Sequence, residues 1–437
     1  MLDRLELKRK GAGPLYRQII RAIAREIQEG SLLPGTRLPS IREFARLYQV
    51  SKITVENAYQ ILEAEGYLES YSRSGHQVAA RPPEARHELP RARDPVPSPP
   101  PSLYDLQSYS VDPRYVDHGN WKRLINEVLR DRSRLYRYGD SQGEEELRLG
   151  ISHYIREYRG VQGEPHELLI GAGTQSLLSL LIPLLEGKPQ RVLFPKEGFR
   201  PAEALFRNYG YQVQTYGSLL EEGHQDALAY LRPGESGLST ARERLAFLEE
   251  GRRRNLLFLE DDYNGEFRWG TRPLPALRSL DPTGETLYLG SFSGVLMPSV
   301  RISYLLLSPS LLPALPETLQ SFNQTASTLE QLALASFIRQ GFLAKQVRRM
   351  RKSYARKSAL LEEGLRAFFP HNHIILEKAS TLETRVRFLC PAPLEAARKK
   401  GVALKATPVP GEYLLVFGGL AEEKILPALE ALKEAWT

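Results

Sequence analysis

The 437-residue chain is 42% hydrophobic and carries a formal net charge of +7, so it can bury large cores, and its length suggests two or three domains. The charge permits a polyanionic partner without requiring one, because many basic proteins only carry a solvated surface. The single cysteine, Cys390, excludes an internal disulfide and argues against a zinc site, so we expect no metal. The start of the sequence lacks an apolar core segment, so we expect no signal peptide. The apolar run Leu177–Leu185 is far shorter than the roughly 18 residues that span a bilayer, so we expect a soluble, cytoplasmic protein with no membrane partner.

Three helices and a hairpin are predicted in the first 80 residues. Apolar residues recur about every four positions over 15–27, which predicts an amphipathic helix beginning near Pro14. Ser40 and Glu43 have the spacing of a capping box, so we expect a second helix to start at Ser40. A third helix follows with Ser51 as its N-cap. Two strand-like runs then surround a Ser-Arg-Ser-Gly turn.

This order of elements predicts a winged helix-turn-helix, in which the N-terminal end of the third helix would enter the major groove of DNA. Periodicity alone leaves a competing interpretation open, namely a small helical bundle that binds protein or nothing. The residues expected to contact DNA bases or backbone come from the second helix, the third helix and the wing: Ser40, Arg42, Ser51, Lys52, Thr54, Asn57, Arg73, Gly75 and His76.

Residues 81–102 are dominated by proline and charge and lack apolar periodicity, which is typical of a semi-rigid linker. The linker separates an N-terminal domain, residues 1–80, from a larger domain, residues 103–437. In the larger domain, short apolar runs at 191–195, 256–260, 286–290 and 302–307 alternate with helical stretches. They predict a mostly parallel sheet covered on both faces by helices. The last third of the chain predicts a smaller α+β subdomain beside that sheet.

The N-terminal domain closely resembles the GntR-type winged-helix domain over residues 12–80. The resemblance rests on a Pro-Gly-x-x-Leu-Pro-Ser-x-Arg motif at Pro34–Arg42 and a Val-Ser-x-x-Thr-Val motif at Val50–Val55. In that family these motifs carry the DNA contacts. Lys52 stands where arginine is more usual, and His76 where threonine is usual. Lysine keeps the charge but loses bidentate base recognition.

The larger domain resembles the fold-type-I aminotransferases, through five stretches that occur in the family's order: 138–155, 169–181, 194–206, 260–267 and 289–305. With the GntR-type domain in front, the chain resembles the MocR group of regulators. This resemblance implies a pyridoxal phosphate (PLP) transferase fold, a homodimer and a pocket for PLP. The phosphate would be held by Gly173, Thr174, Gln175, Ser291, Ser293 and Arg301, with Tyr138 reaching it from a partner subunit.

The resemblance also assigns the ring end of the pocket. Phe199 would stack on the pyridine ring, Asp261 would pair with the ring nitrogen, and Tyr263 would lie beside the ring oxygen. Structural alternatives stay open for several of these residues. The glycines serve equally well as turn residues, Phe199 as core, Asp261 as part of a solvated acidic strand end, and Arg301 as the partner of a carboxylate.

Three departures argue against aminotransferase chemistry. Gly294 occupies the position of the lysine that forms the Schiff base, and glycine can neither form an aldimine nor transfer a proton. No arginine lies near Leu415, where the family clamps the substrate carboxylate. The loop Tyr230–Gly237 replaces most of the Pro-Ser-His-Gln-x-Pro-Thr-Gly loop of the group. It places Arg232 where the partner of the ring oxygen is expected.

We therefore expect a homodimeric transcription regulator that binds a double-stranded DNA operator and is not an enzyme. No cofactor is firmly predicted, and PLP, if it binds, would be noncovalent. One alternative is a regulator that senses PLP or another phosphate ligand noncovalently. The other is a PLP-dependent aminotransferase using a different lysine, for which Lys188 and Lys196 are the nearest candidates. The operator, the target genes and the effector cannot be read from the sequence.

Overall fold

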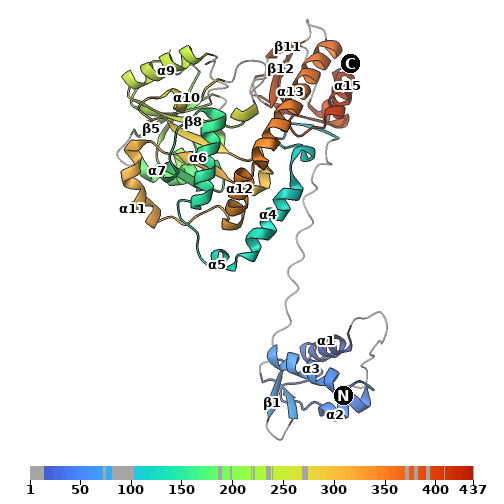
Figure 1. Cartoon of the computed structure of the whole chain (residues 1–437). Helices are drawn as coiled ribbons and strands as arrows, with labels where there is room; N and C mark the ends of the chain where they lie inside the picture. The colour runs from blue at the N-terminus through green and yellow to red at the C-terminus, as the bar shows by residue number, and fades with distance from the viewer. Residues whose placement is uncertain are drawn as a thin grey trace. The chain divides into compact units, whose positions relative to one another are not determined.

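A computed structural model of the chain describes most of its residues, and they fall into two compact units, Met1–Pro100 and Pro101–Thr437 (Figure 1). The described residues are 14–71, 75–80, 103–185, 189–196, 199–217, 219, 222–232, 238, 240–267, 274–369, 374–377, 382–389, 394–407 and 409–436. The expected linker, residues 81–102, as well as Arg73, Lys188 and Cys390, lie outside the described residues.

The first unit is a winged helix-turn-helix, as predicted. Its elements are α1 (Leu15–Gln28), α2 (Ile41–Leu47), α3 (Lys52–Ala64), and the antiparallel strands β1 (Leu68–Tyr71) and β2 (Gly75–Val78). The serines that were predicted to start helices do so: Ser40 Oγ accepts a hydrogen bond from the Glu43 amide at 3.2 Å, and Ser51 Oγ accepts one from the Thr54 amide at 3.1 Å. The cap residues therefore fix where α2 and α3 begin.

One apolar core joins the three helices to the wing. Ile19 and Ile23 of α1 are fully buried against α3, which explains the periodicity seen in the sequence. Tyr59 of α3 packs edge-on against Phe44 of α2, and its hydroxyl donates to the Pro39 carbonyl at 3.0 Å. The ring of His76 from β2 lies 4.9 Å from that of Tyr59. These contacts hold α2, α3 and the wing in one arrangement.

The second unit is built around a seven-stranded sheet. Its strands are β4 (Leu168–Gly171), β5 (Arg191–Pro195), β6 (Gln212–Tyr216), β7 (Ala227–Leu231), β8 (Leu256–Asp261), β9 (Leu287–Ser291) and β10 (Ser303–Leu306). They lie in the order β4-β10-β9-β8-β7-β5-β6. Only β10 runs antiparallel to its neighbours, so the prediction of a mostly parallel sheet is confirmed.

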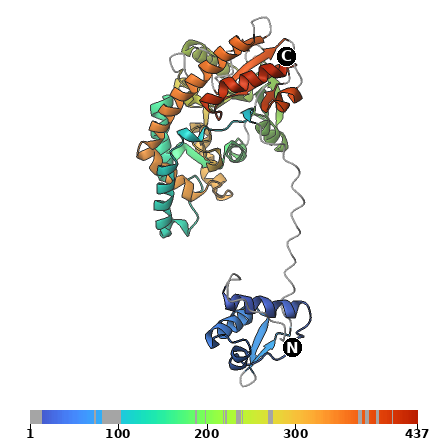
Figure 2. The same ribbon diagram turned by 90° about the vertical axis from the view of Figure 1, so that its right-hand side faces the viewer.

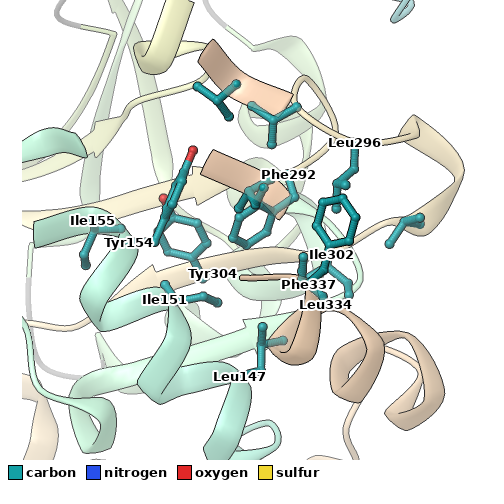
Figure 3. Close-up of a cluster of buried hydrophobic side chains, with 14 of the residues drawn as sticks. Leu147, Ile151, Tyr154, Ile155, Phe292, Leu296, Ile302, Tyr304, Leu334 and Phe337 are labelled. Atoms are coloured by element: carbon teal, nitrogen blue, oxygen red, sulfur yellow. The ribbon is translucent and has the colours of Figure 1, made fainter. Parts of the chain in front are cut away.

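Helices cover this sheet on both faces. They are α6 (Glu145–Arg159), α7 (Thr174–Leu184), α8 (Arg200–Asn208), α9 (Ala241–Arg253), α10 (Leu277–Leu280), α11 (Leu315–Gln320) and α12 (Thr328–Arg339). One core cluster joins α6 and α12 to the segment that follows β9. In it, Phe292, Leu296 and Ile302 point toward Tyr154 of α6 and Phe337 of α12 (Figure 3). This packing fixes the path of the chain between β9 and β10.

The predicted small α+β subdomain is also present. Its sheet has the order β11-β12-β14-β13-β3, and α13 lies alongside α15 (Figure 2). The strands are β3 (Tyr104–Leu106), β11 (Ile374–Glu377), β12 (Glu383–Phe388), β13 (Val402–Ala406) and β14 (Glu412–Val416). The helices are α13 (Phe342–Phe368), α14 (Leu394–Lys399) and α15 (Ile425–Trp436). The sequence did not predict β3, which follows the linker yet pairs in parallel with β13.

Shorter elements complete the unit. These are α4 (His118–Arg130), α5 (Arg132–Leu135), and the 3-10 turns η1 (Pro113–Tyr115), η2 (Pro165–Glu167), η3 (Gly265–Phe267), η4 (Pro298–Val300), η5 (Pro309–Ala314) and η6 (Glu422–Lys424). No helix in the described part of the chain is long and apolar enough to cross a membrane. Within the same residues, His, Cys, Asp and Glu side chains form no group of three that could hold a metal ion.

Candidate functional site

The N-terminal end of α3 exposes polar side chains and one unexpected apolar side chain. Lys52 and Asn57 are exposed, whereas Thr54 is half-buried and its hydroxyl lies 2.7 Å from Ser51 Oγ. Ser51 and Thr54 therefore order the start of the helix, and the longer side chains are free to reach outward. Between them Ile53 is 68% exposed. Sequence reasoning missed Ile53, although a lone apolar residue on the polar face of an amphipathic helix is a readable signal.

Basic and polar residues of α2 and the wing continue this surface. Arg42 is exposed on α2, and neither Arg42 nor Lys52 forms an ion pair with another described residue. Gly75 begins β2, while His76 is half-buried against Tyr59. Two exposed cations near helix N-termini, with no ion-pair partner in the described part of the unit, suit phosphate contacts. Arg73 lies outside the described residues, so its place in the wing stays a prediction.

In the second unit, the residues of the predicted pocket gather at one edge of the large sheet. Asp261 ends β8 and Ser291 ends β9, while Arg232 directly follows β7. Phe199 follows β5 as the N-cap of α8. Strands β5, β7, β8 and β9 run parallel to one another, so their carboxyl ends meet at this edge. Parallel sheets of this type bind ligands there.

The phosphate end contains a small cluster of hydroxyls. Ser291 Oγ accepts a hydrogen bond from Ser303 Oγ at 3.0 Å and donates one to Ser293 Oγ at 3.2 Å. Gly173 is the N-cap of α7, with a backbone φ of 96°. A Cβ added there would come within 2.5 Å of the Arg301 guanidinium, so only glycine permits this approach. The structure thus brings together Gly173, Ser291, Ser293 and Arg301.

The remaining phosphate-end residues lie as follows. Thr174 and Gln175 are the first two residues of α7, half-buried and exposed respectively. Tyr138 is 97% exposed. It lines a hollow with the segment 323–328, whose Thr325 Oγ1 accepts a hydrogen bond from the Ala172 amide at 3.0 Å. That bond connects the hollow to the loop before α7.

At the end of the predicted pocket where the pyridine ring would lie, the side chains form hydrogen bonds and cation–π contacts with one another. Asp261 Oδ2 accepts hydrogen bonds from the Tyr230 hydroxyl and from Arg232 Nε, the latter at 3.0 Å. The Arg232 guanidinium carbon lies 5.9 Å from the ring centre of Phe199 and 5.9 Å from that of Tyr263. Both distances fall within the range of cation–π attraction. Arg232 therefore contacts all three residues that the family uses around the pyridine ring.

Gly294 is buried in the turn that follows β9, against a neighbour of unusual conformation. A Cβ at position 294 would overlap Asn264 Oδ1. Asn264 has a backbone φ of 60°, and no described residue donates a hydrogen bond to its buried Oδ1. Asn264 therefore takes the space that any side chain at position 294 would enter. No motif in the sequence indicates this role for Asn264.

The acidic run at the end of β8 is not a solvated strand end. Glu260, Asp261 and Asp262 are all at most 6% exposed. Asp262 forms a salt bridge with the buried Arg159. The Glu260 carboxylate accepts hydrogen bonds from the backbone amides of Leu277 and Arg278, at 2.9 Å each. Burial, together with the nearby Asp262 charge, raises the pKa of Glu260 to about 7. The alternative of a solvated acidic run is therefore wrong.

The other two departures from the aminotransferase pattern, near Leu415 and in the loop Tyr230–Gly237, lie in different surroundings. Leu415 on β14 is fully buried in the apolar core of the small subdomain. Of the rewritten loop, Tyr230–Arg232 is described as above, and residues 233–237 lie outside the described residues. Lys196 is exposed after β5.

Sequence reasoning also missed a buried ion pair. Lys357 of α13 is 0% exposed, and its Nζ lies 2.9 Å from the Asp112 carboxylate and 3.0 Å from the Gly418 carbonyl. Asp112 in turn forms a salt bridge with Arg114. The pair links the segment before α4 to the turn after β14, which are more than 300 residues apart.

Comparison with known proteins agrees with both halves of this description. Residues 15–78 match the family model of bacterial regulatory proteins, gntR family, and residues 110–233 match that of aminotransferase class I and II. Among solved structures, the α-aminoadipate aminotransferase LysN of Thermus thermophilus superposes with a TM-score of 0.67. It is 22% identical, with 76% of this chain and 91% of that chain covered. The fold and the two matches define a helix-turn-helix unit joined to a fold-type-I aminotransferase unit.

Relatives that match most of the chain are named as transcriptional regulators. The uncharacterized HTH-type transcriptional regulator YhdI of Bacillus subtilis is 35% identical over 98% of this chain and 97% of its own. The probable rhizopine catabolism regulatory protein MocR of Rhizobium meliloti is 32% identical over 81% of this chain and 77% of its own. The chain therefore belongs to the MocR-type HTH transcriptional regulators, and it is a DNA-binding regulator with an aminotransferase-like domain.

Proposed function

We propose that the protein recognises its operator through the exposed surface formed by α2, α3 and the β1–β2 wing. Lys52 and Asn57 would face base edges or phosphates from α3, with Thr54 and Ser51 ordering the helix end. Ser40 and Arg42 would contact the backbone beside α2, and Arg73, Gly75 and His76 would do so from the wing. The observation that supports this assignment is the exposure of Arg42 and Lys52 without an ion-pair partner among the described residues.

The aminotransferase-like unit would supply dimerisation. Tyr136 and Tyr138, in the segment after α5, are 84% and 97% exposed. Aromatic side chains so fully exposed are typical of a surface that a partner covers. A homodimer in the cytoplasm would present two recognition helices to repeated or palindromic half-sites.

The same unit would be catalytically inactive. The residues present do not fit a covalently held PLP: glycine stands at position 294, Asn264 fills the adjoining space, and Asp261 already has two donors. Glycine has no side chain, so position 294 can neither bond to the cofactor nor transfer protons. This geometry is the observation that supports the proposal of a regulator without aminotransferase activity.

DNA binding by the full chain tests the first part. Purified protein is expected to bind a fragment from upstream of its own gene in preference to a large excess of competitor DNA at moderate salt. Equal affinity for the fragment and for the competitor would contradict the proposal, because nonspecific binding depends only on phosphate charge.

A second candidate function, sensing of PLP or another phosphate ligand without a covalent bond, is favoured by the phosphate end. There the Ser291, Ser293 and Ser303 hydroxyls lie together, and Arg301 forms no ion pair with a described residue. Inorganic phosphate or PLP that binds reversibly, is lost on dialysis and changes operator affinity would establish this function. Ligand binding without any effect on operator affinity would exclude it.

A further inference from the structure

We propose that the Arg232 side chain occupies the place of the cofactor ring. Its contacts with the surrounding pocket residues would then exclude a pyridine ligand. The inference rests on the proposed function and extends it, since it names the residue that closes the pocket and the class of ligand that is excluded.

The geometry of Arg232 is that of a bound planar cation. Its Nε donates to Asp261 at 3.0 Å, and its guanidinium lies 5.9 Å from each of the Phe199 and Tyr263 ring centres. In the resemblance to aminotransferases, those three residues pair with the ring nitrogen, stack on the ring and flank its oxygen. A guanidinium is planar, delocalised and permanently charged, so it offers the same combination of flat face and N–H donor as a protonated pyridine.

The Asp261 carboxylate explains why a replacement is needed. Its side chain is only 7% exposed, and a buried carboxylate is costly unless donors and a counter-charge satisfy it. Tyr230 is fully buried and supplies a neutral donor. Arg232 supplies the positive charge, while its own side chain remains 21% exposed. The pair therefore keeps the acid stable without any ligand.

Two barriers to PLP follow, and they are separate. Arg232 occupies the ring end, so any pyridine ligand must displace it from Asp261. Asn264 occupies the space beside Gly294, so even a lysine at position 294 would have to displace the Asn264 side chain. Removing Arg232 should restore binding of the ring without restoring a covalent bond.

Pyridoxamine phosphate is the suitable probe, because its amine cannot condense with surface lysines. We expect the Arg232→Ala variant of the full chain to bind it about tenfold or more tightly than wild type in calorimetric titration. The matched control is Arg254→Ala. Arg254 has a side chain of similar exposure, 25%, in an ion pair with Glu250 on α9, and its removal should leave the affinity at the wild-type value.

If wild type and Arg232→Ala bind pyridoxamine phosphate with the same affinity, the proposal is overturned. Should the alanine variant fail to fold, Arg232→Lys provides the second measurement. Lysine keeps the charge but loses the planar guanidinium, so tighter binding than wild type is expected, and equality with wild type would contradict the role of the guanidinium.

Operator binding, measured on the same samples, separates this inference from the proposed function. Wild type that binds its operator while Arg232→Ala fails to gain pyridoxamine phosphate would overturn only the inference about Arg232. Wild type without operator preference would overturn the proposed function, whatever the ligand titration gives.

Discussion

Two cations of the helix-turn-helix unit and two of the aminotransferase-like unit are held in opposite ways. In the helix-turn-helix unit, Arg42 and Lys52 lie exposed and form no ion pair with another described residue. In the aminotransferase-like unit, Arg232 and Lys357 are paired with Asp261 and Asp112. Exposed unpaired charges are available to a partner, whereas paired ones stabilise the fold in which they lie. The comparison indicates a surface of exposed charges in one unit and charges that are held within the fold in the other.

The strongest test of this contrast is the buried pair at Asp112. Among the described residues, the Asp112→Ala substitution leaves the Gly418 carbonyl as the one hydrogen-bond partner of the fully buried Lys357 ammonium group. A buried charge without a counter-ion should lower the free energy of unfolding by about 3–5 kcal/mol. Urea denaturation measures the change. The control Glu363→Ala, at an exposed position of α13, should stay within about 0.5 kcal/mol of wild type, and a similar loss in both variants would contradict the assignment.

Removing the exposed cations should weaken DNA binding and leave stability alone. For the double variant Arg42→Ala/Lys52→Ala we expect operator affinity to fall about 100-fold, with a log–log salt slope smaller by roughly two charges. Arg21→Ala, which removes an exposed charge from α1, is the matched control and should change affinity little. A wild-type salt slope in the double variant would show that neither residue meets phosphate.

A smaller and more selective effect is expected at Ile53. An exposed apolar side chain at the start of a recognition helix suits a thymine methyl group. The Ile53→Ala variant should lose about 1 kcal/mol of operator binding while keeping its affinity for nonspecific DNA. Equal losses on both DNAs would instead indicate a change in the helix itself.

The smallest effect concerns acid stability. Burial opposes ionisation of Asp112, but the hydrogen bonds from Arg114 and Lys357 outweigh it and hold the pKa of Asp112 below its ordinary value of 3.8. A carboxyl group with a lowered pKa stabilises the fold above its unfolded-state pKa and loses that contribution as pH falls through the folded-state pKa. The free energy of unfolding should therefore fall more steeply below about pH 4 in wild type than in Asp112→Asn. Parallel curves for the two proteins would contradict this origin.

Local signals made much of the fold predictable. The caps at Ser40 and Ser51 fixed helix starts because a cap acts within its own turn. The apolar runs at 191–195 and 256–260 coincide closely with β5 and β8 because strands buried on both faces are continuously hydrophobic. β3 was missed because its three residues form a strand only through β13, nearly 300 residues later in the chain.

The site was predictable only where a motif carries it. Gly173, Ser291 and Arg301 were placed together by resemblance, and the structure brings them to one end of the sheet. The interactions of Arg232 depend on β7 lying beside β8, and the position of Asn264 depends on its left-handed backbone. Neither is a property of neighbouring letters in the sequence.

The most direct test is operator binding by the wild-type full chain in the presence and absence of excess PLP, after dialysis against PLP-free buffer. A regulator whose pocket is filled by Arg232 and Asn264 should give superimposable binding curves and no absorbance of retained PLP. A protein that binds its operator only with PLP, or that keeps PLP through dialysis, would contradict this description of the molecule.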